Sequence, residues 1–410
     1  MSKEVCAQTY TLQQVLDSID AHNTGLQQFV LKTNSSFAEA EASSAWMAPT
    51  VGIGMSEFPY GSGKDMGGGM MSRKMLMLRL QQMFPNFSQQ RKKQAYYQSF
   101  AAQNADDRET NKNMLFAKAK MAYYEAYIAE KKLTLINEQE KQLKLLIQIA
   151  EGRLQYGKAG LPNIYKAQAK LGDLQSMRIR IRSTLARSAA VMNSLMSRPV
   201  NKTLQIDTTV NVLRESVNIL TIDSAYLKNK RTDIRRITDE IHSLDLKQQM
   251  ASGMSKPVFG ITWDNMRMPL SSPENNHSMY MFSAMAMMSI PIAPWFSKEY
   301  KSKIRSMDFQ IQAMQRMQED QVQQTLGNIQ SDWLNLQSAQ VALQVFQTKV
   351  IPAYAKTYQA NLSAFSENTG SIYETLTAWN ELTMKKIEYY DRLSDLLNVK
   401  VMLEAEMQQE

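Results

Sequence analysis

Methionine is the residue type whose number and spacing first suggest chemistry in this sequence. Of the 29 methionines, 17 lie in residues 47–83 and 250–288. Four of them share one side of an alternating segment: Met279, Met281, Met285 and Met287. Thioether sulfur is a soft ligand that suits Cu(I) or Ag(I), so these four residues are a candidate metal site. The competing interpretation is that methionine is a flexible apolar filler, and Met288 beside Met287 departs from a strict ladder.

The remaining residue types offer little for catalysis or for a bound cofactor. Three histidines and the single cysteine Cys6 leave little material for a zinc or haem site. No nucleophile with a neighbouring base emerges, and the glycine-rich residues 61–74 lack the Gly-Lys-Ser/Thr ending of a phosphate-binding loop. The net charge of +8 fits a solvated basic surface. We therefore expect no enzyme, no cofactor and no nucleic-acid partner.

The beginning of the chain leaves two interpretations open. Residues 5–7 (VCA) before Gln8 resemble the small-residue end of a signal cleavage site, so residues 1–7 are either a signal remnant or an added start. Lipidation of Cys6 is the alternative, although residues 3–5 (KEV) make a poor lipidation motif. No run of 18 apolar residues occurs, so a membrane-spanning helix is not expected. Spanning strands stay open, because their signal is weak alternation over short segments.

Four short segments alternate apolar and other residues and predict β-strands. Their apolar faces carry, in chain order, Val51, Ile53 and Met55; Leu76, Leu78 and Leu80; Phe259, Ile261 and Trp263; and Tyr280 and Phe282. The opposite face of the second segment carries Met75, Met77, Arg79, Gln81 and Met83. Over about ten residues, one such face could contact lipid and the other water.

Between these strands the sequence predicts unusually long helices. Residues 88–156 contain no proline and one glycine, Gly152, which allows a helix on the order of 100 Å long at 1.5 Å per residue. A second rod covers residues 297–367 with heptad-like core spacing and a kink expected at Pro352. Return helices are expected up to residue 198 and over residues 371–407, and shorter helices over residues 10–44 and 226–250. Such rods suit a coiled coil or a conduit.

The plan of strand, proline corner and rod occurs twice. Residues 84–88 (FPNFS) match residues 293–297 (APWFS) at an offset of 209 positions. Residues 48–53 pair with residues 256–261 at nearly the same distance, and residues 153–171 pair with residues 364–382. Ordered matches at a nearly constant offset indicate an internal duplication.

These elements predict a mainly α-helical chain with a membrane β-barrel portion, built from duplicated strand hairpins and long helical hairpins. Four strands cannot close, and open strand edges are not tolerated in hydrocarbon, so copies must pool their strands, and three chains would supply twelve. The expected segments are an N-terminal remnant and helix (1–46), a first β-hairpin (47–84), a first helical hairpin (85–198), a linker (199–225), a helix (226–253), a second β-hairpin (254–294) and a second helical hairpin with the C-terminal end (295–410).

Several further features, taken together, resemble a known family. They are Tyr10-Thr11-Leu12 with His22-Asn23 downstream, Pro49 and Pro257 ahead of strands, the two proline corners, and residues 350–353 (VIPA) followed by residues 368–371 (NTGS). With this ordered and duplicated set, the chain resembles the outer-membrane efflux proteins, the TolC-like channels, over nearly its whole length from Tyr10. The heavy-metal efflux type is a candidate subtype.

The resemblance implies an architecture, a place and partners. It implies a homotrimer in the outer membrane of a Gram-negative bacterium, with a twelve-stranded barrel and an α-helical periplasmic tunnel. The channel would passively conduct substrates from a periplasmic adaptor and an inner-membrane efflux pump to the outside, with copper or silver ions as candidate cargo. The family's gate is an Asp-x-x-Asp pattern ahead of an alanine. Here Glu374 and Thr377 occupy those positions, and only Glu374 keeps a carboxylate.

Aromatic and basic residues gather where each strand would leave the bilayer. The candidate membrane-interface residues are Phe84, Phe87, Arg91, Lys92, Lys93, Trp295, Phe296, Lys298 and Lys301. Aromatic rings and long basic side chains commonly occupy this depth, so outer-membrane lipid is an expected partner. The alternative from another class is a soluble helical scaffold that links partners through coiled coils. It accounts for the rods but not for the alternating strands or the proline corners.

Overall fold

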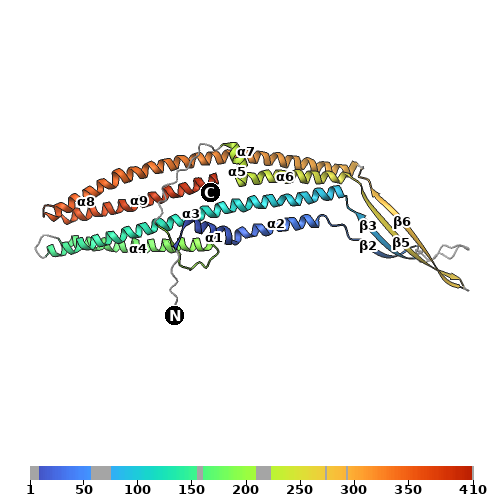
Figure 1. Ribbon diagram of the computed structural model, residues 1–410, viewed down its shortest axis with the longest axis horizontal. Coiled ribbons are helices and arrows are strands. Elements are labelled where there is room, and N and C mark those ends of the chain that lie inside the picture. Colours follow the sequence, from blue (N-terminus) through green and yellow to red (C-terminus); the bar gives the residue numbers. More distant parts are fainter. Residues whose placement is uncertain are drawn as a thin grey trace. The chain divides into compact units, whose positions relative to one another are not determined.

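The structure, a computed structural model, describes residues 9–56, 75–154, 160–208, 223–272, 275–291 and 294–408 (Figure 1). Cys6 and the glycine-rich residues 61–74 lie outside these ranges. The chain divides into two compact units. The helical unit consists of Met1–Phe29, Asp106–Arg235 and Glu319–Glu410, and the sheet unit consists of Val30–Ala105 and Arg236–Gln318.

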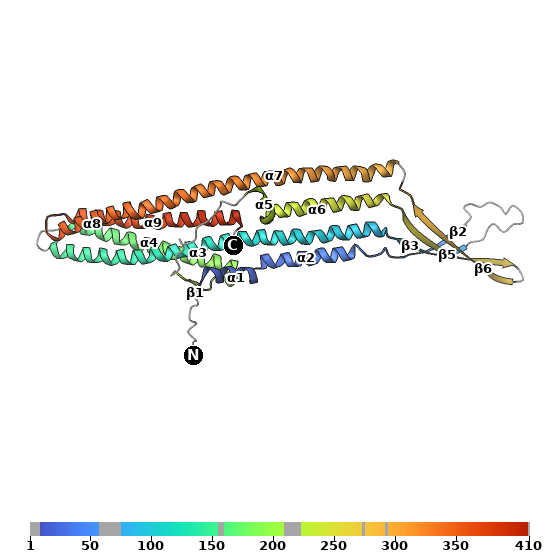
Figure 2. The same cartoon turned by 45° about the horizontal axis from the view of Figure 1, so that its top comes forward.

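The four predicted strands form one antiparallel sheet in the sheet unit (Figure 2). They are β2 (Thr50–Ser56), β3 (Met75–Phe84), β5 (Val258–Ser272) and β6 (Asn275–Ser289). Their order is β2-β3-β5-β6, so the two hairpins of the duplication pair through β3 and β5. Within the described strands the pairing is continuous, without a bulge. Strands β2 and β6 are therefore the two edges of the sheet.

Two long helices follow the two hairpins, as the sequence predicts. Helix α3 (Phe87–Leu154) starts after Pro85, and the Asn86 side chain caps it by accepting the backbone N–H groups of Ser88 and Gln89 at 3.1 and 3.2 Å. Helix α7 starts at the second corner (Pro294–Val345), because proline fits the first helical turn, where no donor is needed.

The second rod is interrupted, and the interruption precedes the expected kink at Pro352. A π-helical turn, η2 (Phe346–Val350), separates α7 from α8 (Ile351–Ser366). Proline has no backbone N–H to continue the α-helical ladder, and its ring crowds the preceding turn. The wider turn restores pairing, since the Ile351 N–H donates to the Phe346 carbonyl.

The two shorter helices expected from the sequence are each split in two. Residues 10–44 form α1 (Leu12–His22) and α2 (Thr24–Ala42), and residues 226–250 fall in α5 (Ser224–Lys230) and α6 (Thr232–Ser252). At the first break the buried Asn23 side chain donates to the Leu195 carbonyl at 2.7 Å. At the second break Arg231 binds the Glu406 carboxylate at 2.6 Å. Both partners are remote in the sequence, so local periodicity could not reveal them.

The helical unit contains two buried apolar clusters. One joins the end of α3 to α4 (Leu161–Leu195), α8 and α9 (Ile372–Met407). The predicted α3 stripe belongs to it, with Leu143, Ile147 and Ala150 buried. The other cluster joins α1, the middle of α3 and the ends of α7 and α9. Beside it, β1 (Thr9–Tyr10) pairs in parallel with β4 (Gln205–Ile206), which falls in the expected linker.

Candidate functional site

One face of the four-stranded sheet is mostly apolar, and many of its side chains are exposed. The register places the alternating apolar residues of all four strands on it: Val51, Ile53, Met55, Leu76, Leu78, Leu80, Phe259, Ile261, Trp263, Tyr280 and Phe282. The same face also carries Gln82, Asn265 and Arg267. Ile53 and Phe282, on the two edge strands, are 79% and 73% exposed. The predicted faces are thus confirmed, and an apolar surface of this kind is typical of a lipid-facing sheet.

The opposite face combines polar side chains with methionines. Its central row holds an ion pair, in which Arg79 Nε and Nη2 donate to the two carboxylate oxygens of Asp264 at 2.7 and 3.1 Å. Asp264 is 5% exposed, so this bidentate pairing compensates a carboxylate that is removed from solvent. We refer to this side of the sheet, with its methionines, as the methionine face.

The four predicted metal ligands all lie on the methionine face, but they are not alone there. Met279, Met281, Met285 and Met287 are opposite Met268, Met266, Thr262 and Gly260 of β5. Strand β3 adds Met77, which faces Met266, and Met83, which faces Gly260. These β3 and β5 residues were not among the predicted ligands, since their proximity depends on which strands pair. Met288 lies on the apolar face, opposite Phe259.

No group of three or more histidine, cysteine, aspartate or glutamate side chains in the described part of the chain could hold a metal ion. None of the described helices is long and apolar enough to cross a membrane.

The predicted gate residues lie in the first turns of α9. Glu374 completes a capping box, in which its Oε2 accepts the Ser371 N–H at 3.5 Å. The Thr377 hydroxyl donates to the Tyr373 carbonyl at 2.9 Å, within its own helix. Both side chains are exposed. The spacing Ser371-x-x-Glu374 is a capping-box signature, and it could have revealed this local role from the sequence.

A contact that the sequence analysis missed joins the ends of the two helical hairpins. Arg153, at the end of α3, donates from Nη1 to the Phe365 carbonyl at 2.6 Å and from Nη2 to the Ser366 carbonyl at 3.2 Å. Its guanidinium carbon also lies 4.1 Å from the centre of the Phe365 ring. The last carbonyls of α8 carry partial negative charge, so the cation is well placed to tie α8 to α3. We call this contact the Arg153 lock.

The corner residues show how the predicted interface is built. Trp46, which the sequence analysis did not select, packs edge-on against Phe84 and Phe87 with ring centres 5.7 and 6.0 Å apart. Lys92 is engaged within the sheet unit, since its Nζ donates to the Gln249 carbonyl at 3.2 Å and to Ser252. The exposed cations of the predicted set are Arg91, Lys93, Lys298 and Lys301. The side chain of Trp295 is outside the described part.

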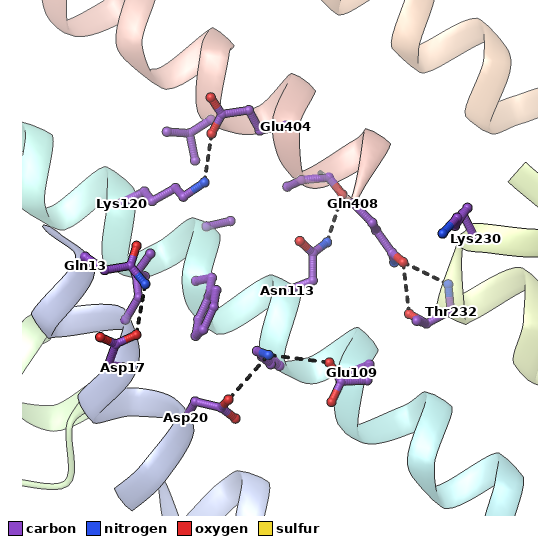
Figure 3. Close-up of a pocket in the computed structure, with 16 residues that line it drawn as sticks. Gln13, Asp17, Asp20, Glu109, Asn113, Lys120, Lys230, Thr232, Glu404 and Gln408 are labelled. Atoms are coloured by element: carbon purple, nitrogen blue, oxygen red, sulfur yellow. Dashed lines mark hydrogen bonds and ion pairs between the residues drawn. The ribbon is translucent and has the colours of Figure 1, made fainter. Parts of the chain in front are cut away.

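The helical unit also has a cavity of about 340 Å³ between α1, α3, the joint of α5 and α6, and the end of α9 (Figure 3). Opposite charges pair across it, including Lys120 with Glu404 at 2.8 Å. Burial would raise the pKa of Asp20, but the hydrogen bond from Arg108 and the charge of Lys112 outweigh burial and lower that pKa. This network joins the two halves of the duplication.

The chain is similar in structure to several solved channel proteins. It matches CusC, reported with transmembrane channel formation, with a TM-score of 0.75 at 15% identity over 98% of this chain and 92% of CusC. It matches the outer-membrane channel OprN with a TM-score of 0.74 at 14% identity over 97% and 90% of the two chains. It matches the outer-membrane channel CmeC of Campylobacter jejuni with a TM-score of 0.72 at 14% identity, over 97% of this chain and 87% of CmeC.

The likeness is one of structure rather than of sequence. No family model matches the sequence, and no curated protein matches it either. The structural match nevertheless extends over nearly the whole chain and covers both halves of the duplication. The resemblance inferred from the sequence is thus confirmed at the level of fold: the chain has the fold of the TolC-like outer-membrane efflux channels.

Proposed function

We propose that this chain is one subunit of a homotrimeric outer-membrane channel of a Gram-negative bacterium. Three copies would pool their strands into a twelve-stranded barrel, and their long helices would line a periplasmic tunnel. The channel would passively conduct substrates delivered by a periplasmic adaptor and an inner-membrane pump. The fold shared with OprN and CmeC supports the channel role.

The observation that carries this proposal is that the four-stranded sheet, as far as the structure describes it, has both an exposed apolar face and two edge strands without partners. Strands β2 and β6 each have one side without a partner among the described strands, and Ile53 and Phe282 on those strands are exposed. In hydrocarbon an unpaired backbone edge costs several kcal/mol per group. Pairing β2 of one copy with β6 of the next would satisfy both edges and direct the apolar face to lipid.

The direct test is to extract the full chain with detergent and measure its mass, and then to record its conductance in planar bilayers. A trimer that conducts supports the proposal. A stable monomer in aqueous buffer, without conductance, would instead favour the soluble helical scaffold.

We propose soft metal ions, copper or silver, as one class of cargo. The support is the methionine face, which is the side of the sheet that would line the channel if the apolar face meets lipid. Neutral thioethers accommodate such ions without holding a hard, hydrated cation.

Glu374→Gln is expected to reduce the preference of the channel for cations several-fold. Threefold symmetry would bring three Glu374 carboxylates together and raise the local cation concentration. Glutamine also serves at this position of a capping box, so the substitution removes the charge and preserves the cap. Reversal potentials in a salt gradient measure the effect. Glu151→Gln, at another exposed carboxylate, is the control, and an unchanged potential in an intact trimer would leave Glu374 with its capping role alone.

Neutralising the exposed corner cations is expected to weaken membrane anchoring at low salt. Each charge near anionic lipid contributes about 1 kcal/mol, and salt screens it. Arg91, Lys93, Lys298 and Lys301 are the residues to change to glutamine, and Lys92 is retained because it is engaged within the protein. The measurement is the melting temperature of the assembly in vesicles with anionic lipid, at low and high salt.

The matched control for this experiment neutralises four exposed cations in the helical unit: Lys141, Arg180, Arg182 and Lys356. The corner variant should lose stability at low salt, whereas the control should not. Equal melting temperatures for the corner variant and its parent at both salt concentrations would mean that these cations only solvate the helix starts.

A further inference from the structure

The methionine face contains a row in which three strands present methionine at the same level. Met77 of β3 faces Met266 of β5, and Met266 in turn faces Met281 of β6. The corresponding residue of β2 is Gly54, which faces Met77. Continuing the β3–β5 register by one residue would bring Met75 of β3 beside Met268, which faces Met279, so a second group of methionines borders this row.

The geometry of a sheet favours this row over a set taken from a single strand. Same-face neighbours along one strand are about 7 Å apart, two residues at 3.4 Å each. Directly opposed residues on neighbouring strands have Cα atoms only about 4.5–5.5 Å apart. Long, unbranched side chains from three adjacent strands can thus converge over the middle strand. A site formed by β6 alone would need sulfur atoms from residues at least about 7 Å apart along the strand to meet at one ion. This applies to Met279, Met281, Met285 and Met287.

One of the three sulfur atoms already has a partner, because Arg79 Nη2 donates to the Met77 sulfur at 4.0 Å, and a bound cation would replace this contact. All three side chains are half-buried, so their sulfur atoms are partly removed from water. The Met77 methyl carbon lies 3.7 Å from the position that a Cβ on Gly54 would occupy. The end of this side chain therefore lies over β2, and metal binding would require it to turn towards Met266. The sulfur of Met83 lies directly over Gly260, so this side chain packs against the backbone of β5.

The electrostatic surroundings are compatible with a monovalent cation. The next level holds Arg79 and Asp264, whose bidentate pairing makes that level neutral. On the other side Met268 faces Met279, and Met268 is 5% exposed. A cation at the three-methionine row would lie beside the Arg79 guanidinium, which contacts the Met77 sulfur and whose charge is compensated by Asp264. Further thioethers are one level away.

We propose that Met77, Met266 and Met281 together bind a soft monovalent cation, Cu(I) or Ag(I), through their three thioether sulfurs. Thioether ligands select such ions over Mg²⁺ and Ca²⁺, which require oxygen ligands. The inference rests on the proposed channel for its purpose, because the row would then lie along the route of the cargo. The site itself is formed within one chain and needs no second copy.

The test measures Ag(I) binding to the full-length chain in detergent, in chloride-free buffer. All proteins carry Cys6→Ser, because a thiolate would bind silver on its own. Bound silver per chain is counted by elemental mass spectrometry after desalting, and X-ray absorption reports silver–sulfur scattering. We expect one tightly bound Ag(I) per chain, unaffected by excess Mg²⁺ or Ca²⁺.

The decisive variant is the triple change of Met77, Met266 and Met281 to leucine, which nearly conserves volume. It should weaken silver binding at least tenfold. The matched control changes three exposed methionines elsewhere to leucine, Met114, Met288 and Met317, and should bind like the parent. Failure of the parent to bind silver, or equal losses in both triple variants, would overturn the inference and support methionine as packing material.

Conductance measured on the same preparations separates this inference from the proposed function. Channels that conduct but bind no silver would overturn only the metal site. Silver binding that is lost in the triple variant, in a protein that never conducts, would support the site and contradict the channel.

Discussion

A Leu80→Arg substitution is expected to abolish insertion of the proposed trimer into membranes. Leu80 lies near the middle of β3, on the exposed apolar face. Arginine on the lipid face of a barrel near the bilayer midplane costs about 2–4 kcal/mol. Three copies would therefore cost roughly 6–12 kcal/mol per trimer, comparable with the whole stability of a typical domain.

The neighbouring residue provides the control for this experiment. Gln81 belongs to the same strand but to the methionine face, opposite Thr262. Gln81→Arg introduces the same side chain on the side that would face water, so trimer recovery should remain close to that of the parent. The measurement is the fraction of detergent-extracted protein that migrates as trimer after refolding into vesicles. Similar losses for both variants would mean that the apolar face does not meet lipid.

Arg153→Ala is expected to raise the spontaneous open probability of the proposed channel at least tenfold. The substitution removes the Arg153 lock, namely two hydrogen bonds to the end of α8 and the contact with the Phe365 ring. In a half-exposed position these interactions together are worth roughly 2–4 kcal/mol, and each 1.4 kcal/mol is about tenfold in an equilibrium. Single-channel recordings without partner proteins would measure the change.

Two variants make the interpretation of the Arg153 experiment specific. Arg153→Lys keeps the charge but lacks the planar fork that reaches both carbonyls, so its open probability should lie between those of the parent and the alanine variant. Arg180→Ala, at an exposed arginine of α4, should leave gating unchanged. A folded Arg153→Ala trimer with the open probability of the parent would show that the lock stabilises the hairpin ends without controlling the pore.

Most of the secondary structure could be predicted because its causes are local. Alternation with period two follows from the geometry of a strand, and it placed Leu76, Leu78 and Leu80 on the face where the structure has them. Proline restricts its own backbone and that of the preceding residue, so both corners could be located. The duplication was visible because both copies keep these local rules in the same order.

The helix breaks could not be predicted because they depend on contacts between residues far apart in the chain. The helix breaks at Asn23 and Arg231 are stabilised by the Leu195 carbonyl and the Glu406 carboxylate, which helical periodicity does not register. The capping role of Glu374 is a different case. Its signal lies three residues away at Ser371 and was present in the sequence.

The three-methionine row shows most clearly where sequence and tertiary structure divide. Alternation alone assigns Met77, Met266 and Met281 to one face of each strand, because successive side chains point to opposite sides. It does not state which strands are neighbours or at what level they pair. Only the pairing of β3 with β5 and of β5 with β6 brings the three together. A slip of one residue would move a strand's whole set to the opposite face, so the row exists only in this register.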